Sequence, residues 1–305
     1  MSLYRKHRPA TLDALVGNDA QIEALDGIFN GPMEDWPRSF MVAGPSGCGK
    51  TTIARIIARQ HIKASEMNIR EVNTADNRGI DTAREIIDTL RYVPPGGGPL
   101  VYIIDECHMT TKEWQNAMLK PLEDGPRWVF FFLCTTIPAK LDKAIHTRCT
   151  QITVQPQDEK SLFRLVRRVA KAEKFEIADR VLEALATAAG GSPRAALVAL
   201  EKVATMRTED AQMQAVEGSV EEETETRELC QALLGSDWKP VAVALQGLRQ
   251  QDAEKTRRAV LGYMTSVVLS SGKHKAALVL QAFQEHTYDV GFPGVVCMAY
   301  AAMHQ

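Results

Sequence analysis

The sequence contains few aromatic residues and no long apolar run. Phe, Trp and Tyr make up only 6% of the 305 residues, so aliphatic side chains must supply most of any buried core. Nowhere do eighteen apolar residues follow one another, and the first residues, MSLYRKHRPATLDALVG, include no apolar stretch of signal-peptide length. These absences predict a cytoplasmic protein without a membrane partner. The length is sufficient for two or three domains.

The chain also lacks a strong charge of either sign and lacks closely spaced cysteines. Its 36 Lys and Arg against 38 Asp and Glu leave a formal net charge of −2. That balance excludes a generally basic nucleic-acid binder but allows a local basic patch. Scattered cysteines fit reduced thiols better than a disulfide framework or a zinc site, so we expect no structural metal. The six cysteines are Cys48, Cys107, Cys134, Cys149, Cys230 and Cys297.

The most informative stretch is residues 40–60, FMVAGPSGCGKTTIARIIARQ. Four apolar residues precede the loop GPSGCGKT, and helix formers with apolar residues at helical spacing follow it. In the order strand, loop, helix, the N–H groups of the loop and the positive end of the helix converge on one anion. The stretch therefore predicts a binding site for a nucleoside triphosphate.

The glycines, the lysine and the threonine of this loop each have a physical role in binding a nucleotide. The glycines let the backbone approach the phosphates and adopt positive φ angles. Lys50 would reach the β and γ phosphate oxygens, and Thr51 would offer its hydroxyl to Mg²⁺. The loop residues predicted to contact ATP are Gly44, Gly47, Cys48, Gly49, Lys50, Thr51 and Thr52.

An acidic pair follows a second apolar run. Residues 100–104, LVYII, have the length and composition of a buried parallel strand, and Asp105 and Glu106 come directly after it. Open α/β sheets bind their ligands at the carboxyl ends of the strands. Asp105 would hold Mg²⁺ through water, and Glu106 would orient or deprotonate the water that attacks ATP. The alternative is that the two acids only cap a helix at residues 110–123.

Strands and helices alternate over the first 155 residues. Further apolar strands are predicted at residues 69–72, 128–134 and 152–154, and helices at residues 19–29 and 81–90. The pattern predicts a five-stranded parallel α/β sheet covered by helices on both faces. Thr136 follows the strand at residues 128–134, where it could hydrogen-bond the attacking water or the γ-phosphate. Threonines also end strands routinely.

Only helices are predicted after residue 157. Amphipathic segments at residues 158–174, 178–189 and 193–206 would form a small helical domain. Arg194 lies in the first turn of the third segment. Since a cation there is unfavourable to the helix dipole, we expect Arg194 to serve another purpose.

These patterns divide the chain into three predicted domains. An ATP-binding α/β domain spans residues 1–155, and a helical lid domain spans residues 156–216. Residues 217–305 would form an all-α domain, whose most economical role is to bind other chains. Its acidic start, residues 217–228, has the composition of a solvated linker or an exposed first helical turn.

Seven segments occur in order along the chain, namely YRKHRPATLDALVGND, GPSGCGKTT, ADNRGIDTARE, VYIIDECHMTTKEWQNAMLKPLE, CTTIP, HTRC and GGSPRAAL. Together they resemble the ATPase subunits of sliding-clamp loaders, which belong to the AAA+ class. That family includes replication factor C small subunits, bacterial polymerase III gamma/tau subunits and phage clamp-loader subunits. The resemblance covers residues 3–205 and implies a P-loop fold followed by a lid. The remaining residues match only in being helical, where the family has an oligomerising collar.

The segment from Thr147 to Cys149 looks like the Ser-Arg-Cys motif of that family. The resemblance implies that Arg148 is an arginine finger inserted into the ATP site of a neighbouring subunit, where its charge stabilises the transition state. The alternative is a surface arginine before a strand. By the same resemblance, Thr136 matches sensor 1 and Arg194 matches sensor 2, which senses the γ-phosphate from the lid. The residues that match those around the adenine are Tyr4, Arg8, Pro9 and Val16.

The segment ADNRGIDTARE looks like the eukaryotic, archaeal and phage branches of the family, in which the start of this helix faces the DNA backbone. Helix N-termini offer N–H groups to phosphate, and such contacts would be independent of base sequence. The alternative is an ordinary surface turn with a charged helix start. The residues predicted to contact DNA are Arg78, Gly79, Ile80, Thr111 and Lys112.

Two departures from the family pattern affect the origin that we expect. Bacterial gamma/tau subunits carry a four-cysteine zinc module after the phosphate loop, whereas this chain has no cysteine between Cys48 and Cys107. The segments DECHMTTKEWQNAMLKPLE and CTTIPAKLDKAIHTRC nevertheless resemble the bacterial subunits more than replication factor C. The mixture favours a phage-encoded or otherwise divergent loader, located in the cytoplasm of a bacterium or of a phage-infected host.

The resemblance implies a DNA-stimulated ATPase that places a sliding clamp on primer-template DNA and releases it closed after hydrolysis. Its partners would be the clamp, the DNA and other loader subunits in a ring or spiral, with several copies of the chain and a distinct subunit. One alternative is another DNA-associated AAA+ machine, such as a branch-migration motor or a helicase loader. A second alternative is a scaffold subunit that binds ATP without hydrolysing it.

Overall fold

A computed structural model describes the chain except for residues 1, 75–76, 95, 286, 288–289 and 305. The chain forms two compact units, Met1–Gln212 and Met213–Gln305, which we describe separately. The finer division into three domains, with boundaries at residues 155 and 216, stays a prediction.

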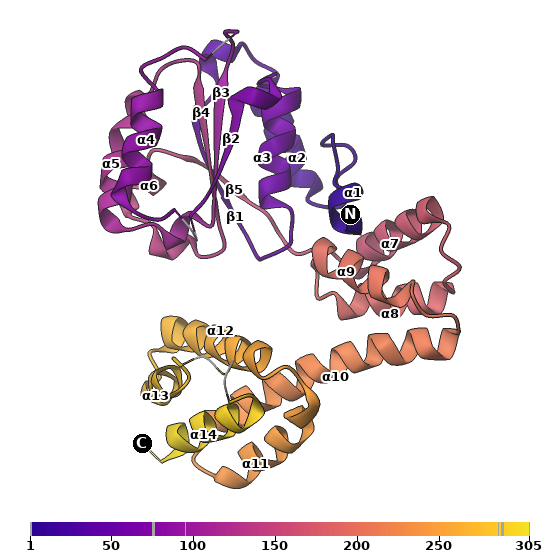
Figure 1. Cartoon of the computed structure of the whole chain (residues 1–305). Coiled ribbons are helices and arrows are strands. Elements are labelled where there is room, and N and C mark those ends of the chain that lie inside the picture. The colour runs from indigo at the N-terminus through magenta and orange to yellow at the C-terminus, as the bar shows by residue number, and fades with distance from the viewer. Residues whose placement is uncertain (1, 75–76, 95, 286, 288–289, 305) are drawn as a thin grey trace. The chain divides into compact units, whose positions relative to one another are not determined.

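A sheet of five parallel strands forms the centre of the first unit (Figure 1). Across the sheet the strands lie in the order β2-β3-β4-β1-β5, and every neighbouring pair is parallel. The predicted five-stranded parallel sheet is therefore confirmed. The strands are β1 (Ser39–Ala43), β2 (Ile69–Asn73), β3 (Leu100–Asp105), β4 (Val129–Thr135) and β5 (Thr150–Thr153).

Two groups of helices cover the two faces of the sheet (Figure 1). One face carries α2 (Asp19–Phe29) and α3 (Lys50–Gln60), and the other carries α4 (Ile80–Thr89), α5 (Lys112–Asp124) and α6 (Lys143–His146). The helices predicted before and after the phosphate loop are confirmed, and their ends differ from the predictions by a few residues at most.

Alternate side chains of β4 enter two separate cores. Phe130 and Phe132 lie in the core beneath α2 and α3, whereas Phe131 and Leu133 lie in the core beneath α4, α5 and α6. All four side chains are buried. A strand that is covered on both faces reads as an unbroken apolar run rather than as an alternating pattern, which explains the sequence WVFFFLC.

Four further helices lie wholly within the described residues of the first unit. The short helix α1 (Leu3–Lys6) contacts α9 (Pro193–Val203), which packs with α7 (Glu159–Glu173) and α8 (Asp179–Ala188). We call α7, α8 and α9 the lid helices. Single 3₁₀ turns lie at Met33–Asp35, Glu66–Asn68, Cys107–Met109 and Pro138–Lys140 in this unit, and at Leu248–Gln250 in the second.

The regular elements that the structure describes in the second unit are all helices. Its core is formed mainly by aliphatic side chains, together with Cys230, Met264 and Phe283. The helices that contribute to it are α10 (Glu209–Leu233), α11 (Trp238–Gly247), α12 (Ala253–Ser271), α13 (His274–Ala282) and α14 (Phe292–Met303).

One expectation for the second unit is wrong. Residues 217–228 form neither a linker nor the first turn of a helix, because they lie within α10. Glutamate is a good helix former, so a run of glutamates can continue a helix even where its charge density suggests a solvated connection.

A cluster of hydrogen bonds around Glu254 joins α12 to the segment after α13. Arg257 donates from Nη2 to Glu254 Oε1 at 2.6 Å and from Nη1 to the carbonyl oxygen of Phe283 at 2.7 Å. The backbone N–H of Thr287 donates to Glu254 Oε2 at 3.1 Å. These bonds, above all the one from Arg257, hold the pKa of Glu254 well below its usual value of 4.5.

Two expectations from the sequence concern the state of the cysteines and the presence of membrane-spanning segments. The six cysteines, all within the described part of the chain, are free, and burial raises the pKa of the Cys149 and Cys230 thiols to about 12. Among the helices that the structure describes, none is both long and apolar enough to cross a membrane.

Candidate functional site

The candidate site lies at the carboxyl edge of the sheet. Strand β1 ends at Ala43 in register with Thr135 of β4 and Thr153 of β5. The loop after β1 is fixed to its neighbours from its first residue, because Gly44 N–H donates to the carbonyl oxygen of Thr135 at 3.2 Å. Side chains that follow β1, β3 and β4 therefore meet at one edge, as is usual for ligand sites in open parallel sheets.

Two loop glycines occupy positions that a side chain could not. Gly47 has φ of +76°, and a Cβ atom there would lie 2.2 Å from Ser192 Oγ. Gly44 has φ of +156°, and a Cβ atom there would lie 2.3 Å from the carbonyl oxygen of Val154. Gly49 also has a positive φ, +101°, and caps the start of α3. The loop thus takes the backbone path that was predicted from its glycines.

Lys50 begins α3 with its side chain folded back over the loop. The residue is only 5% exposed, and Nζ donates to the carbonyl oxygens of Gly44 and Pro45, each at 2.9 Å. These two bonds use two of the three donors of the ammonium group. The loop therefore holds a positive charge at the N-terminus of α3, where the helix dipole also favours an anion.

Thr51 and Asp105 lie close enough to hold one cation. Thr51 Oγ1 donates to Asp105 Oδ2 at 3.1 Å, which joins the first turn of α3 to the end of β3. A hydroxyl and a carboxylate are the oxygen ligands that Mg²⁺ takes in nucleotide sites. The pair predicted as metal ligands is thus brought together, and its chemistry fits Mg²⁺.

Glu106 lies in a strained turn directly after β3. Its φ of +51° is unusual for a residue with a side chain and costs roughly 1–2 kcal/mol. Thr74 supports the turn, because its hydroxyl lies 2.9 Å from the carbonyl oxygen of Asp105 and 2.6 Å from that of Glu106. Backbone strain that the surroundings enforce is typical of functional sites.

The Glu106 carboxylate has two side-chain neighbours. Thr136 Oγ1 donates to Glu106 Oε2 at 3.2 Å, so the two residues predicted to act on the attacking water lie together. His108 Nδ1 lies 3.3 Å from the same oxygen. Burial lowers the pKa of His108, and the negative charge of Glu106 opposes that effect. Sequence reasoning missed His108, although its place after the acidic pair was visible.

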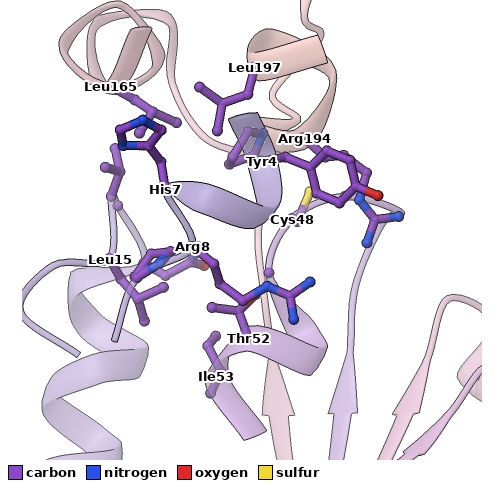
Figure 2. A pocket seen from close by; sticks show the side chains of 17 residues that line it. Tyr4, His7, Arg8, Leu15, Cys48, Thr52, Ile53, Leu165, Arg194 and Leu197 are labelled. Atoms are coloured by element: carbon purple, nitrogen blue, oxygen red, sulfur yellow. The ribbon is translucent and has the colours of Figure 1, made fainter. Parts of the chain in front are cut away.

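A pocket beside the loop contains the residues predicted to surround the base. Figure 2 shows their side chains between α3 below and the lid helices above. The predicted residues that line it are Tyr4, Arg8, Pro9, Val16, Gly47, Cys48, Gly49, Thr52 and Arg194. The residues that sequence reasoning missed are His7, Leu15, Gly17, Asn18, Ile53, Leu165, Pro193 and Leu197. The mainly apolar wall with few polar groups suits a flat heterocycle.

The lid helices and the N-terminal segment close the pocket together. The guanidinium of Arg194 lies over the ring of Tyr4, 5.6 Å from its centroid. On the other side, Lys6 Nζ lies 2.8 Å from the Glu173 carboxylate, which His7 also contacts. Arg194 therefore faces the pocket rather than its own helix, in agreement with the unfavourable position that the sequence gives it.

Arg148 lies near the amino-terminal ends of the strands, opposite the end that carries the phosphate loop. It comes two residues before Thr150, which is paired with Phe40 near the start of β1, whereas the phosphate loop follows the end of β1. Five residues of strand separate the two edges by roughly 16 Å. The guanidinium binds locally instead, since Nε donates to Glu123 Oε2 at 2.7 Å and Nη1 to the carbonyl oxygen of Ala144 at 2.9 Å.

The predicted DNA-contacting residues come together on two neighbouring helix starts. Thr111 N–H donates to the carbonyl oxygen of Arg78 at 3.0 Å, which joins the segment before α4 to the cap of α5. Arg78 and Lys112 are exposed, and Gly79 and Ile80 are partly exposed. The two cations thus lie at two helix starts that one backbone hydrogen bond joins.

Comparisons with known proteins agree with the geometry. Residues 40–157 match the family "ATPase family associated with various cellular activities (AAA)". The chain is 32% identical over 225 residues to the DNA polymerase III subunit tau/gamma of Haemophilus influenzae, which covers 67% of this chain and 32% of that protein. It is 28% identical over 235 residues to the tau subunit of Bacillus subtilis, which covers 69% of this chain and 41% of that protein.

The likeness to the curated relatives covers part of their length, and the likeness to solved structures concerns the fold. The matched region spans about a third to two fifths of the length of these two curated relatives. Among solved structures, the Thermotoga maritima RuvB Holliday junction branch migration motor matches with a TM-score of 0.62 over 80% of this chain and 87% of that chain. Its sequence identity is 20%, so the likeness concerns the fold alone.

We predict that Gly47→Ala weakens nucleotide binding by about ten-fold or more, because the left-handed backbone and the clash with Ser192 Oγ each disfavour a Cβ atom there. Titration with a fluorescent ATP analogue measures the effect. Gly27→Ala is the matched control, since Gly27 lies exposed in α2 with nothing within 4 Å of the added Cβ atom. Equal affinities of the two variants would contradict the assigned loop geometry.

Proposed function

We propose that this chain, which belongs to the AAA family of ATPases and is homologous to DNA polymerase III gamma/tau subunits, is an ATP-hydrolysing subunit of a sliding-clamp loader. The observation that carries the proposal is the separation of two half-sites on one chain. The residues predicted to bind phosphate and Mg²⁺ lie at the carboxyl ends of the strands, and Arg148 lies near the amino ends. An arginine so placed can complete a neighbour's site but not its own.

In the proposed cis half-site, the loop and Lys50 bind the phosphates of ATP, and the pocket beside α1 and the lid takes the base. Thr51 and Asp105 hold Mg²⁺, which when bound neutralises charge that develops on the phosphates. Glu106 accepts a hydrogen bond from the attacking water and orients it, and Thr136 fixes the carboxylate. Arg194 would sense the γ-phosphate from α9.

In the proposed trans half-site, Arg148 reaches the γ-phosphate bound by the next subunit. Head-to-tail contacts of this kind build rings or spirals, because one surface of each copy binds a different surface of the next copy. In the free chain the guanidinium donates hydrogen bonds to Glu123 and to the carbonyl oxygen of Ala144.

The proposed reaction cycle couples these half-sites to DNA. ATP held between subunits stabilises a spiral that binds an open clamp. Primer-template DNA inside the spiral then aligns Arg148 with the neighbouring γ-phosphate, and hydrolysis releases the closed clamp. The assembly would contain several copies of this chain and a distinct subunit, and it would act in the cytoplasm of a bacterium or of a phage-infected host.

The basic surface at Arg78, Gly79, Ile80, Thr111 and Lys112 would contact the DNA backbone. Exposed cations beside helix N-termini recognise phosphate without reading bases. Loading at any primer junction requires binding of that kind.

Two other functions remain as alternatives with distinct signatures. A branch-migration motor shares the fold, but identity to its solved example is 20%, below that to the tau/gamma subunits. A scaffold that binds ATP without hydrolysis would not need Thr136 to hold Glu106 beside the phosphate loop. Turnover with primed DNA distinguishes all three.

We predict that Arg148→Ala lowers DNA-stimulated ATP turnover by roughly 10³-fold or more, the usual effect of losing an arginine finger. Lys50→Ala also abolishes turnover, but by removing the phosphate ligand in cis. Mixing the two variants restores activity, because Arg148 of the Lys50→Ala chain can serve the intact site of its neighbour. At equal amounts, about a quarter of neighbouring pairs regain a complete site.

In the mixing experiment, phosphate release measures ATP turnover of the chain assembled with its partner subunits. Arg127→Ala, which removes another exposed arginine, is the control and keeps wild-type turnover. If the mixture is as inactive as each variant alone, Arg148 does not act in trans.

We further predict that Arg78→Ala and Lys112→Ala each weaken binding to primer-template DNA equally for all sequences. Each substitution lowers the slope of log K against log salt by about one for every copy in contact with the backbone. Fluorescence anisotropy at several salt concentrations measures both quantities. Arg84→Ala is the matched control, because Arg84 lies exposed on α4 in a pair with Asp81. A change in the control as large as in the other variants contradicts the assigned surface.

A further inference from the structure

Glu173 is the last residue of α7, and a negative charge at that end of a helix is unfavourable to the helix dipole. Lys174 follows it as the C-cap with a left-handed φ of +59°, so the helix ends there. The carboxylate of Glu173 therefore gains nothing from its own helix. Its position indicates a partner outside α7.

The N-terminal segment, residues 2–9, supplies two partners for Glu173. Lys6 Nζ donates to Glu173 Oε2 at 2.8 Å, and His7 Nε2 is hydrogen-bonded to Glu173 Oε1. The side chains of Glu173 and His7 are only 15% and 20% exposed, so water screens this cluster less than it screens an exposed ion pair. The contacts with Lys6 and His7 hold the pKa of Glu173 below its usual value of 4.5.

The N-terminal segment depends on such contacts because its helix is short. α1 is a single turn of four residues, and one helical turn is unfavourable without tertiary contacts. Leu3 is buried, and α1 packs against α9. Lys6 is the last residue of α1 and His7 is its C-cap, so their contacts with Glu173 join the end of the turn to α7. Two of the lid helices thus hold the segment.

The contact with Glu173 lies beside the pocket that would take the base. Tyr4 and His7 line this pocket from the N-terminal segment, and Leu165 and Arg194 line it from the lid helices. Figure 2 shows His7 and Leu165 on one side of the pocket and Tyr4 and Arg194 on the other. The described residues that line the pocket do not include Glu173. Its influence on a ligand would therefore pass through His7 and the segment that carries it.

We propose that Glu173 is a positioning residue that joins the N-terminal segment to the lid helices around a bound nucleotide and so slows its release. A base held between these two elements leaves when they separate, and separation breaks the hydrogen bonds of Lys6 and His7 with Glu173. The inference rests on the proposed function, from which it takes the nucleotide site, but it involves no step of hydrolysis.

The direct test is the rate at which the full chain releases a fluorescent ATP analogue after rapid mixing with excess unlabelled ATP. We expect Glu173→Gln to raise the dissociation rate constant by about five-fold, as for the loss of a partly exposed charge-assisted contact. The association rate constant should stay within about two-fold of wild type, because the contact is already broken in the open state that admits the nucleotide. An ADP analogue should show the same increase, since Glu173 lies beside the base pocket rather than the γ-phosphate.

Glu183→Gln is the matched control, because Glu183 lies exposed on α8, and we expect it to keep the wild-type dissociation rate constant. A thermal denaturation measurement accompanies each variant. If Glu173→Gln lowers the denaturation temperature but leaves the dissociation rate constant unchanged, Glu173 serves only the stability of the fold and the proposal is overturned.

A second variant removes the contact from the other element. Lys6→Met alone should raise the dissociation rate constant by about two-fold, because His7 still binds Glu173. In the Glu173→Gln background Lys6→Met should have no further effect, since its partner has already lost its charge. Equal fractional increases in the two backgrounds would show that Lys6 does not act through Glu173.

The outcomes for Glu173 and for the proposed function are distinguishable. If the wild type binds the analogue and primed DNA stimulates its turnover, a wild-type release rate in Glu173→Gln overturns only the role of Glu173. If Glu173→Gln releases the analogue faster but primed DNA has no effect on turnover, the clamp-loader function fails and the role of Glu173 stands. A wild type that binds no nucleotide overturns both.

Discussion

The close approach of the glycine loop to the carboxyl edge of the sheet is the constraint on which the site depends. Gly44 and Gly47 lie so near the backbone of Val154 and the side chain of Ser192 that no Cβ atom fits. That approach brings Lys50 and Thr51 to the end of β3, where Thr51 meets Asp105. That approach therefore joins the predicted phosphate ligands to the predicted cation ligands.

The parallel sheet imposes the second constraint, which is the distance between the amino-terminal and the carboxyl-terminal ends of its strands. Residues that follow a strand and residues that precede one lie a strand length apart, roughly 16 Å for β1. Lys50 and Glu106 follow strands, and Arg148 precedes one. An arginine fixed by Glu123 at the far edge is useful to phosphate chemistry only if another copy brings a phosphate to it.

The sequence allowed prediction of features whose chemistry is local and failed for those that depend on tertiary contacts. The phosphate loop, the buried strands and the acidic pair each carry their signal within a few neighbouring residues. Leu165 and Leu197 read as ordinary core positions of amphipathic helices, because nothing in their spacing indicates that they line a pocket. The partners of His108 and Arg148 depend on the left-handed turn at Glu106 and on the packing of α5, which no local pattern reveals. Residues 217–228 were misread because charge density obscured a helical propensity.

The central claim is that the loop binds MgATP and that Glu106 drives its hydrolysis. The direct measurement compares wild type with Glu106→Gln for both analogue binding and phosphate release. The account predicts equal binding and a loss of turnover of about 100-fold or more in the variant, as expected when a general base is removed. Equal turnover in the two proteins, or binding that fails in both, would contradict it.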